Sequence, residues 1–189
     1  MQLEPTVETI RTARLELVPL TAPFIEALMR GDLPAAERQI GAGVSHWLAI
    51  ESAHLVQLYL AQLTADAAGL EALGRAMVLV PSAGRRRVIG SIGFHGPPDH
   101  RGRLELGCTI EPAYRRQGFA AEAMTALFDW AETRYGITRF LVSVPSSVAS
   151  GQDPSGRVPF EIGFNEAESR SEQIDGLGLA LEAERPPSS

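Results

Sequence analysis

Cysteine is almost absent from this sequence, and long apolar segments are absent too. Among 189 residues only Cys108 carries a thiol, which excludes an internal disulfide and is compatible with a reducing compartment. No apolar run approaches the roughly 20 residues that cross a bilayer, and the first residues lack the basic and apolar regions of a signal peptide. We therefore expect a cytoplasmic protein that does not enter membranes.

An excess of positive charge is also lacking. The formal net charge is −6 and the pI is about 5.3. Nucleic-acid binding draws on many lysine and arginine contacts to phosphate, so this charge argues against nucleic acid as the main partner. The triplet Arg85-Arg86-Arg87 falls at a predicted hairpin turn, where we interpret it as solvated surface.

Hydrophobic residues are plentiful, at 44% of the chain, which is enough for one domain with a sizeable core. We see no internal repeat and no second domain. The sequence predicts an extension over residues 1–9, one domain over residues 10–184 and a polar, mobile tail over residues 185–189.

The most informative stretch runs from residue 103 to residue 135. Apolar and polar or small residues alternate over 104–110, which predicts a strand with Glu105 on the face opposite Leu104 and Leu106. Apolar residues then recur at helical spacing from about residue 119. Gly136 is placed to end this helix, because glycine adopts the left-handed conformation found there.

The connection between this strand and this helix has the properties of an anion site. The first turn of a helix presents backbone N–H groups without intrahelical partners, together with the positive end of the dipole. Gly118 lets a ligand approach that backbone, and Arg115 and Arg116 could bond phosphate oxygens. A diphosphate would fit; the alternative is a solvated turn with two surface arginines.

The remaining pattern predicts a mixed α/β domain. Strands are expected over residues 12–20, 75–80, 87–95, 138–144 and 176–182, and helices over residues 22–30, 32–40 and 52–65. Residues 41–47 read as a loop, and residues 164–169 as the antiparallel partner of the last strand. The strands at 104–110 and 138–144 flank a helix, which implies a right-handed crossover and a parallel pair in an otherwise mostly antiparallel sheet.

The turn resembles motif A of the GCN5-related N-acetyltransferases (GNAT), whose signature is matched by Arg115, Gly118 and Ala120. Neighbouring residues are similar to the family as well: Glu105-Leu106-Gly107, Pro112, Tyr114 and Glu122-Ala123. The words T-A-R-L-E-L-V-P-L-T from residue 12 resemble the opening strand of the RimJ/RimL branch. This resemblance implies a single-domain GNAT fold, whose helices flank a sheet that splays at its central parallel strand pair.

The resemblance also implies acetyl-CoA as cosubstrate, an amine as acceptor and no metal. The diphosphate would bind at the turn, and the pantetheine arm would bind the backbone of the earlier parallel strand. The residues assigned to the cofactor on this basis are Cys108, Thr109, Ile110, Arg115, Arg116, Gln117, Gly118, Phe119, Ala120 and Ser147. Relatives often pair, so a homodimer is possible.

The chemistry needs an amine made neutral and a stabilised oxyanion. Glu105 is the preferred general base because of its strand parity, with His95 as substitute; the alternative for Glu105 is an ion pair with Arg103 or Arg139. In many relatives of the family that this chain resembles, a later tyrosine protonates the departing thiolate; no tyrosine follows Tyr135 here, so Ser143, Ser147 or water would assist. Cys108 could be acylated, although a small buried side chain is the preferred interpretation.

Two questions stay open at this stage. The segment 145–160 lacks the Asn that the family usually carries there and contains Pro154 and Pro159, which should break its helix. A catalytically weak or inactive module that binds acyl-CoA or a partner protein is therefore the competing hypothesis; a P-loop is disfavoured because no Lys-Ser/Thr follows Gly118. Four residues either contact the acceptor or serve as core and surface residues: His46, Trp47, His54 and Tyr59.

Overall fold

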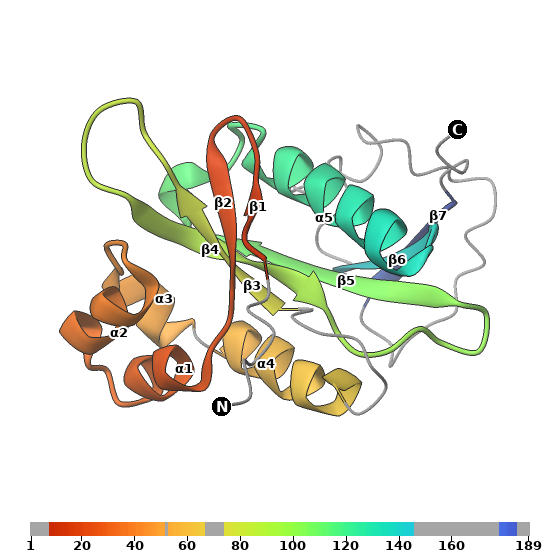
Figure 1. Ribbon diagram of the computed structural model, residues 1–189, viewed down its shortest axis with the longest axis horizontal. Helices are drawn as coiled ribbons and strands as arrows, with labels where there is room; N and C mark the ends of the chain where they lie inside the picture. Colours follow the sequence, from red (N-terminus) through yellow and green to blue (C-terminus); the bar gives the residue numbers. More distant parts are fainter. Residues whose placement is uncertain (1–7, 52, 67–73, 146–177, 185–189) are drawn as a thin grey trace, which may run out of the picture.

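The computed structural model describes residues 8–51, 53–66, 74–145 and 178–184 (Figure 1). The strands in these ranges are β1 (Ile10–Arg11), β2 (Leu15–Pro19), β3 (Gly74–Leu79), β4 (Arg87–Phe94), β5 (Arg103–Ile110), β6 (Arg139–Pro145) and β7 (Gly178–Glu184). The helices are α1 (Ala22–Met29), α2 (Leu33–Ile40), α3 (His46–Ile50), α4 (Ala53–Asp66) and α5 (Phe119–Tyr135), with a 3-10 turn η1 (Pro112–Tyr114) before α5.

One sheet carries all the described strands, in the order β1-β2-β3-β4-β5-β6-β7. Neighbours are antiparallel except β5 and β6, which are parallel because α5 crosses over between them. This confirms the predicted mixed, mostly antiparallel architecture. Residues 164–169, the expected partner of the last strand, lie outside the described residues; β7 itself pairs with β6.

Helices cover both faces of the sheet (Figure 1). On one face α5 buries the stripe that its helical spacing predicted, including Ala123, Leu127 and Phe128, against strand residues such as Leu104 and Phe140. The other face packs against α1 to α4. Successive side chains of a strand point to opposite faces, so β3 contributes to both cores: Met77 packs on the α5 side, and Ala76 and Val78 pack on the side of α1 to α4.

Local sequence signals explain most helix boundaries. The Asp32 side chain accepts a hydrogen bond from Ala35 N at the start of α2, and Gly41 ends that helix with φ 68°. Gly136 ends α5 in the same left-handed conformation, as predicted. Thr21 occupies the N-cap position of α1, although its side chain makes no capping hydrogen bond.

Two short elements escaped the sequence analysis. The predicted loop over residues 41–47 gives way at His46 to α3, whose first turn is capped by Ser45 accepting from Leu48 N. Strand β1 has two residues and forms a hairpin with β2. Elements this short contain too few residues to show a period, so tertiary contacts decide them.

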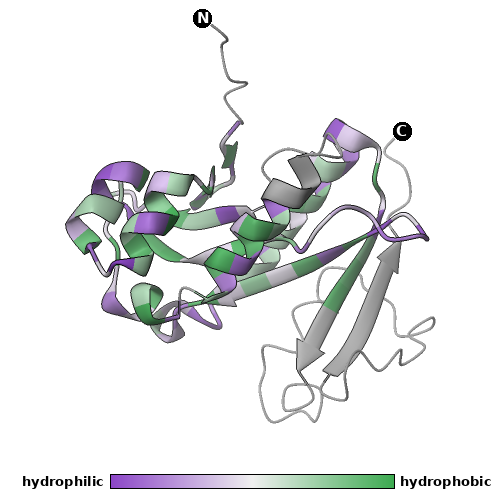
Figure 2. Cartoon of the chain, turned by 90° about the horizontal axis from the view of Figure 1, so that it is seen from below, coloured by the Kyte–Doolittle hydropathy of each residue, from purple (hydrophilic) through white to green (hydrophobic). Residues whose placement is uncertain are grey.

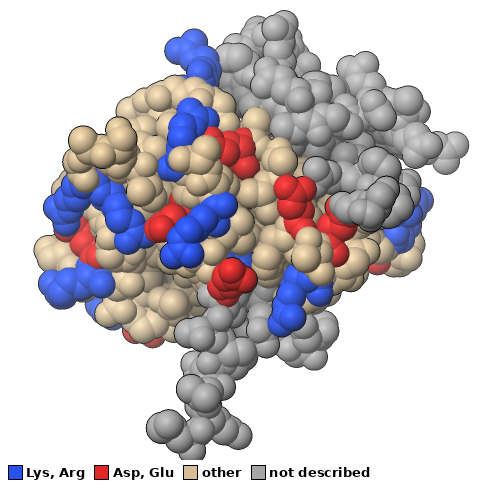
Figure 3. Space-filling view, turned by 45° about the horizontal axis from the view of Figure 1, so that its top comes forward, with Lys and Arg blue, Asp and Glu red and all other residues tan. Residues whose placement is uncertain are grey.

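The basic triplet at the β3–β4 turn is held by carboxylates. Arg85 forms an ion pair with Glu37, and Arg86 forms one with Glu16. Arginines and acidic residues are interspersed over the face shown in Figure 3. The triplet therefore belongs to a mixed-charge surface. No helix in the described part of the chain has the length and apolar character needed to span a bilayer.

Candidate functional site

The turn between η1 and α5, residues 115–118, is exposed and opens the helix with unusual backbone geometry. Arg116 has φ 60° and Gly118, the N-cap, has φ 80°. Left-handed residues are typical of nests, in which successive N–H groups point to one side and suit anions. The first α5 hydrogen bond joins Glu122 N to Gly118 O, so the amides of residues 119–121 precede the intrahelical ladder.

The side chains of the turn leave its backbone accessible. Arg115 Nε donates to Ile110 O at 2.8 Å, which ties the turn to the end of β5. Gln117 Nε2 donates to Ala113 O at 3.1 Å. Arg116 is exposed. We call residues 115–120 the phosphate turn; its exposed residues could hold a diphosphate, and Arg115 is partly committed to Ile110.

Arg14, from the β1–β2 hairpin, lies across the phosphate turn. Its Nε and Nη2 each lie 2.7 Å from Glu122 Oε2, and its Nη1 donates to Gln117 O at 2.9 Å. Thr12 Oγ1 donates to Glu122 Oε1 at 2.5 Å. Burial would raise the pKa of Glu122, but the hydrogen bonds from Thr12 and Arg14 outweigh it, and the pKa lies below its ordinary value.

Sequence reasoning missed this contact. The sequence T-A-R-L, which contains Arg14, was part of the family resemblance. Arg14 and Glu122 are nevertheless 108 positions apart in the chain. No local pattern could pair them, and the charge of Arg14 next to that of Glu122 is visible only in the folded chain.

Strands β5 and β6 separate beside the phosphate turn. Their parallel pairing runs from Arg103 opposite Arg139 to Leu106 opposite Val142, although β5 continues to Ile110 (Figure 2). This is the predicted splay. His95 N bonds Glu105 O, so the backbone of the odd-numbered residues of β5 faces β4 and that of the even-numbered residues faces β6.

This parity decides which backbone groups face the separation. Cys108 N–H and C=O point toward the side from which β6 has diverged, and the Ile110 carbonyl on the same side accepts from Arg115. The Thr109 carbonyl points toward β4, where a Cβ added to Gly90 would overlap it.

Three polar side chains gather on the α4 side of β5, over Gly107. His95 Nδ1 lies 3.6 Å from Glu105 Oε1, so the two predicted base candidates are neighbours. His54, from α4, stands with its ring centroid 5.8 Å from that of His95. A Cβ at Gly107 would overlap Nε2 of both imidazoles, so glycine there makes room for the pair. We call His54, His95 and Glu105 the imidazole cluster.

His54 is anchored and uncharged. Its Nδ1 lies 2.8 Å from Ser91 Oγ on β4. Burial, and secondarily the charge of His95, lowers the pKa of His54 from 6.5 to about 4. Its ring is therefore neutral at neutral pH, and its Nε2 is directed toward β5. Glu105 Oε1 lies 3.6 Å from His95 Nδ1, and Arg103 forms an ion pair with Asp99 at 2.7 Å.

Acid should destabilise the fold through His54. Between pH 6.5 and 4 the unfolded chain binds a proton at this position that the folded chain does not, so stability is complete above pH 6.5 and falls below it. We expect urea unfolding to show a loss of up to about 3 kcal/mol over this range. His54→Gln should flatten the slope, whereas His46→Gln, at an exposed imidazole, should leave it unchanged. Equal slopes in all three proteins would contradict this role.

The other predicted residues have varied positions. Burial raises the pKa of Cys108 to about 12, so it is a protonated thiol and a poor nucleophile. His46 is exposed, whereas Trp47 and Tyr59 pack against the α1–α4 core. Ser143 belongs to β6. Ser147 and most of the segment 145–160 lie outside the described residues.

A mixed sheet whose one parallel strand pair separates beside an exposed helix start is an architecture of acyl-CoA-dependent transferases. The acetyltransferase (GNAT) domain matches residues 14–165, and the chain belongs to this family. The family uses acetyl-CoA. No group of three or more His, Cys, Asp or Glu side chains in the described ranges is arranged to hold a metal ion.

Individual relatives agree with this assignment. The uncharacterized N-acetyltransferase YjdG of Bacillus subtilis is 28% identical over 81 residues, which are 43% of this chain and 48% of that protein, so the chain covers about half its length. An acetyltransferase from Agrobacterium tumefaciens is 21% identical with a TM-score of 0.60, covering 98% of this chain and 99% of its own.

RimL, a ribosomal L7/L12 α-N-protein acetyltransferase solved with coenzyme A, is 14% identical with a TM-score of 0.56. This similarity covers 93% of the present chain and 95% of the RimL chain. At 21% and 14% identity, the similarity of this chain to these two solved structures shows the fold alone.

Proposed function

We propose that this chain transfers an acetyl group from acetyl-CoA to a primary amine. The observation that carries the proposal is the separation of β5 from β6 immediately beside the phosphate turn. The amides of the phosphate turn would bind the diphosphate, and the neighbouring backbone of β5 would bind the extended pantetheine arm. The two parts of acetyl-CoA follow each other in the same order.

The residues present fit the cofactor. The phosphate turn, Arg115 to Ala120 including Gln117 and Phe119, would hold the diphosphate through backbone N–H groups, with Arg116 adding charge. Cys108 and Ile110 would hold the pantetheine arm through their backbone; the Thr109 carbonyl faces β4 instead. Ser147 remains a sequence-based assignment.

Bound acetyl-CoA supplies an electrophilic thioester carbonyl and a thiol leaving group. Glu105 takes a proton from the acceptor ammonium, with His95 at 3.6 Å to share or pass on the charge. The freed lone pair would form the C–N bond as the C–S bond breaks, and the second proton that leaves the nitrogen would pass to the thiolate through solvent or Ser143. The Cys108 N–H faces the gap between β5 and β6, where it would donate to the thioester carbonyl oxygen and stabilise its developing charge.

The imidazole cluster defines the acceptor side. Glu105 and His95 are each about one-third exposed, while His54 is more deeply placed and neutral. Together they offer hydrogen-bond acceptors to an amine. The acceptor itself stays unassigned; RimL's target makes peptide N-termini a class to include in the test.

The test combines binding with turnover. Calorimetry with acetyl-CoA comes first, followed by thiol release over a panel of peptides with Ser or Ala N-termini, polyamines and aminoglycosides. Binding with release for at least one amine supports the proposal. Binding without release for any amine favours the acyl-CoA-binding module, and no binding refutes both.

Gly118 offers a direct test of the phosphate turn. Gly118→Leu should weaken acetyl-CoA binding at least about tenfold, because φ 80° strains any side chain and the new Cβ would lie 3.4 Å from Arg14 Nη2. Gly102→Leu is the matched control: φ is 73°, nothing lies within 4 Å of its Cβ, and the site is distant in the sheet register. Affinity unchanged in Gly118→Leu would count against the turn as the diphosphate site.

A further inference from the structure

We propose that Arg14 is a positioning residue for the cofactor diphosphate, brought to the phosphate turn by the β1–β2 hairpin. The inference rests on the proposed function. It assigns a residue outside the turn, on a segment more than 100 positions earlier in the chain, to the geometry and charge of the diphosphate site.

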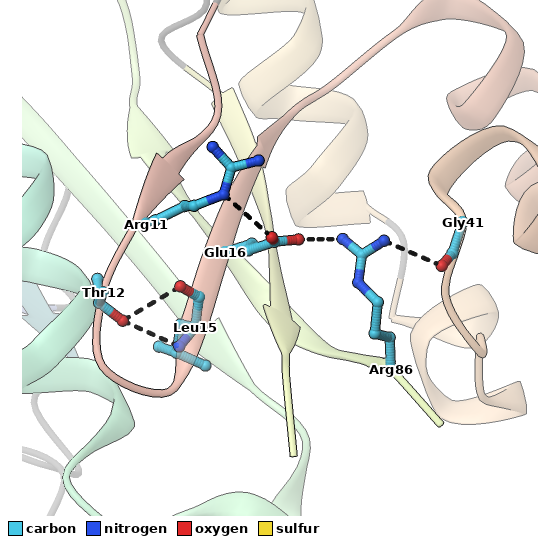
Figure 4. Close-up of polar contacts among 6 residues, drawn as sticks. All are labelled: Arg11, Thr12, Leu15, Glu16, Gly41 and Arg86. Carbon is cyan, nitrogen blue, oxygen red and sulfur yellow. Dashed lines mark hydrogen bonds and ion pairs between the residues drawn. The ribbon is translucent and has the colours of Figure 1, made fainter. Parts of the chain in front are cut away.

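The hairpin is a fixed platform. Thr12 Oγ1 accepts from Leu15 N at 2.9 Å (Figure 4), and Thr12 N donates to Leu15 O at 2.9 Å, which closes the hairpin turn. Glu16 forms ion pairs with Arg11 and Arg86, and Arg86 Nη1 donates to Gly41 O (Figure 4). Pairing of β2 with β3, and the contacts with the β3–β4 turn and the end of α2, thus hold the hairpin in addition to its contacts with α5.

Arg14 connects this platform to the phosphate turn by contacts of three kinds. Its guanidinium makes a two-pronged ion pair with Glu122, donates to Gln117 O, and lies 4.3 Å from the centroid of the Phe119 ring. Its backbone N–H donates to Glu122 Oε1 at 2.8 Å. Planar, multidentate donation of this kind fixes orientation as well as distance.

The bond to Gln117 O sets the direction of the next amide. In a trans peptide the C=O and the following N–H point in opposite directions. Because Arg14 holds the Gln117 carbonyl toward the hairpin, the Gly118 N–H is turned away from the hairpin, toward the exposed side of the turn. The Arg14 side chain therefore helps to orient an amide that the diphosphate would meet.

Arg14 also balances charge at the helix start. Glu122 lies in the first turn of α5, where its carboxylate would repel a diphosphate bound at the amides. Four donors from Thr12 and Arg14 engage that carboxylate, and Arg14 brings a positive charge within 2.7 Å of it. Without Arg14, the phosphate turn would face an uncompensated negative charge.

Four variants test the inference: Arg14→Met, Glu122→Gln, the double variant Arg14→Met/Glu122→Gln, and Arg11→Met as control. Arg11 is an exposed arginine of the same hairpin whose partner is Glu16, so its loss leaves the phosphate turn untouched. Calorimetry with acetyl-CoA should show about tenfold weaker binding for Arg14→Met, partial recovery in the double variant, and unchanged binding for Arg11→Met.

A second readout separates positioning from general damage. S-acetylpantetheine carries the thioester without the diphosphate, so kcat/KM for this donor, with the best amine of the panel, should be nearly equal in wild type and Arg14→Met. Arg14→Lys keeps the positive charge but loses the planar, multidentate guanidinium, so it should bind acetyl-CoA with intermediate affinity. This variant replaces Arg14→Met in the test if Arg14→Met fails to fold. Wild-type affinity in Arg14→Met or Arg14→Lys, or an equal loss with both donors, would overturn the inference. No binding by wild type would instead refute the proposed function.

Discussion

Glu105→Gln is expected to lower kcat by about two to three orders of magnitude, the usual contribution of a positioned general base. Glutamine preserves shape and hydrogen bonding but cannot accept a proton. The affinity for acetyl-CoA should stay close to that of wild type, because Glu105 lies on the α4 side of β5, whereas the cofactor backbone contacts are assigned to the edge that faces β6. Steady-state kinetics and calorimetry would measure both quantities.

An acceptor of low basicity distinguishes a general base at Glu105 from a Glu105 carboxylate that has only a structural role. A hydrazide is uncharged at neutral pH and needs no prior deprotonation, so the Glu105→Gln defect should shrink markedly with a hydrazide acceptor. Glu111→Gln is the matched control, since this nearby carboxylate accepts from Ser45 Oγ at 3.1 Å and is assigned no chemistry. An equal defect with both acceptors would contradict the base assignment, and a larger defect in His95→Gln would transfer the role to His95.

Gly90→Ala should destabilise the protein severely, by about 3 kcal/mol or more. An added Cβ would overlap the Thr109 carbonyl oxygen and lie 3.0 Å from Ile110 Cα. Both are backbone atoms of β5, so no side-chain rotation relieves the clash, and β5 must shift against β4. Urea unfolding monitored by circular dichroism measures the loss directly.

The same shift would disturb the site. The end of β5 carries the Cys108 and Ile110 backbone and the carbonyl that Arg115 binds, so surviving folded Gly90→Ala should also bind acetyl-CoA poorly. Gly43→Ala is the control, because its Cβ would meet the nearest atom, Arg86 O, at an ordinary 3.5 Å. If Gly90→Ala were as stable as Gly43→Ala, the close approach of β4 to β5 would be wrong.

The imidazole cluster could be foreseen only in part. Strand alternation predicted the face that Glu105 occupies, and His95 was considered because it follows the neighbouring strand. His54 was expected either to contact the acceptor or to be exposed; the structure places it half-buried beside Ser91, because helical spacing over residues 52–65 does not fix how α4 lies on the sheet. Packing of α4 against β3 and β4 brings its imidazole over Gly107.

The phosphate turn was predictable because its determinants are local. Gly118 and the start of α5 lie within a few residues of each other, and helix geometry alone leaves the first amides without intrahelical partners. The crossover through α5 likewise required the parallel β5–β6 pair. The family resemblance added the cofactor to this local reading.

Periodicity, capping residues and chain connectivity therefore determined the elements, the sheet type and the turn that opens α5, because each depends on neighbours in sequence. Tertiary structure alone decided the contact of Arg14 with Glu122, the meeting of His54 with His95 over Gly107, and the residue at which β5 and β6 part. These features join distant segments, and their geometry depends on how helices and strands pack in three dimensions.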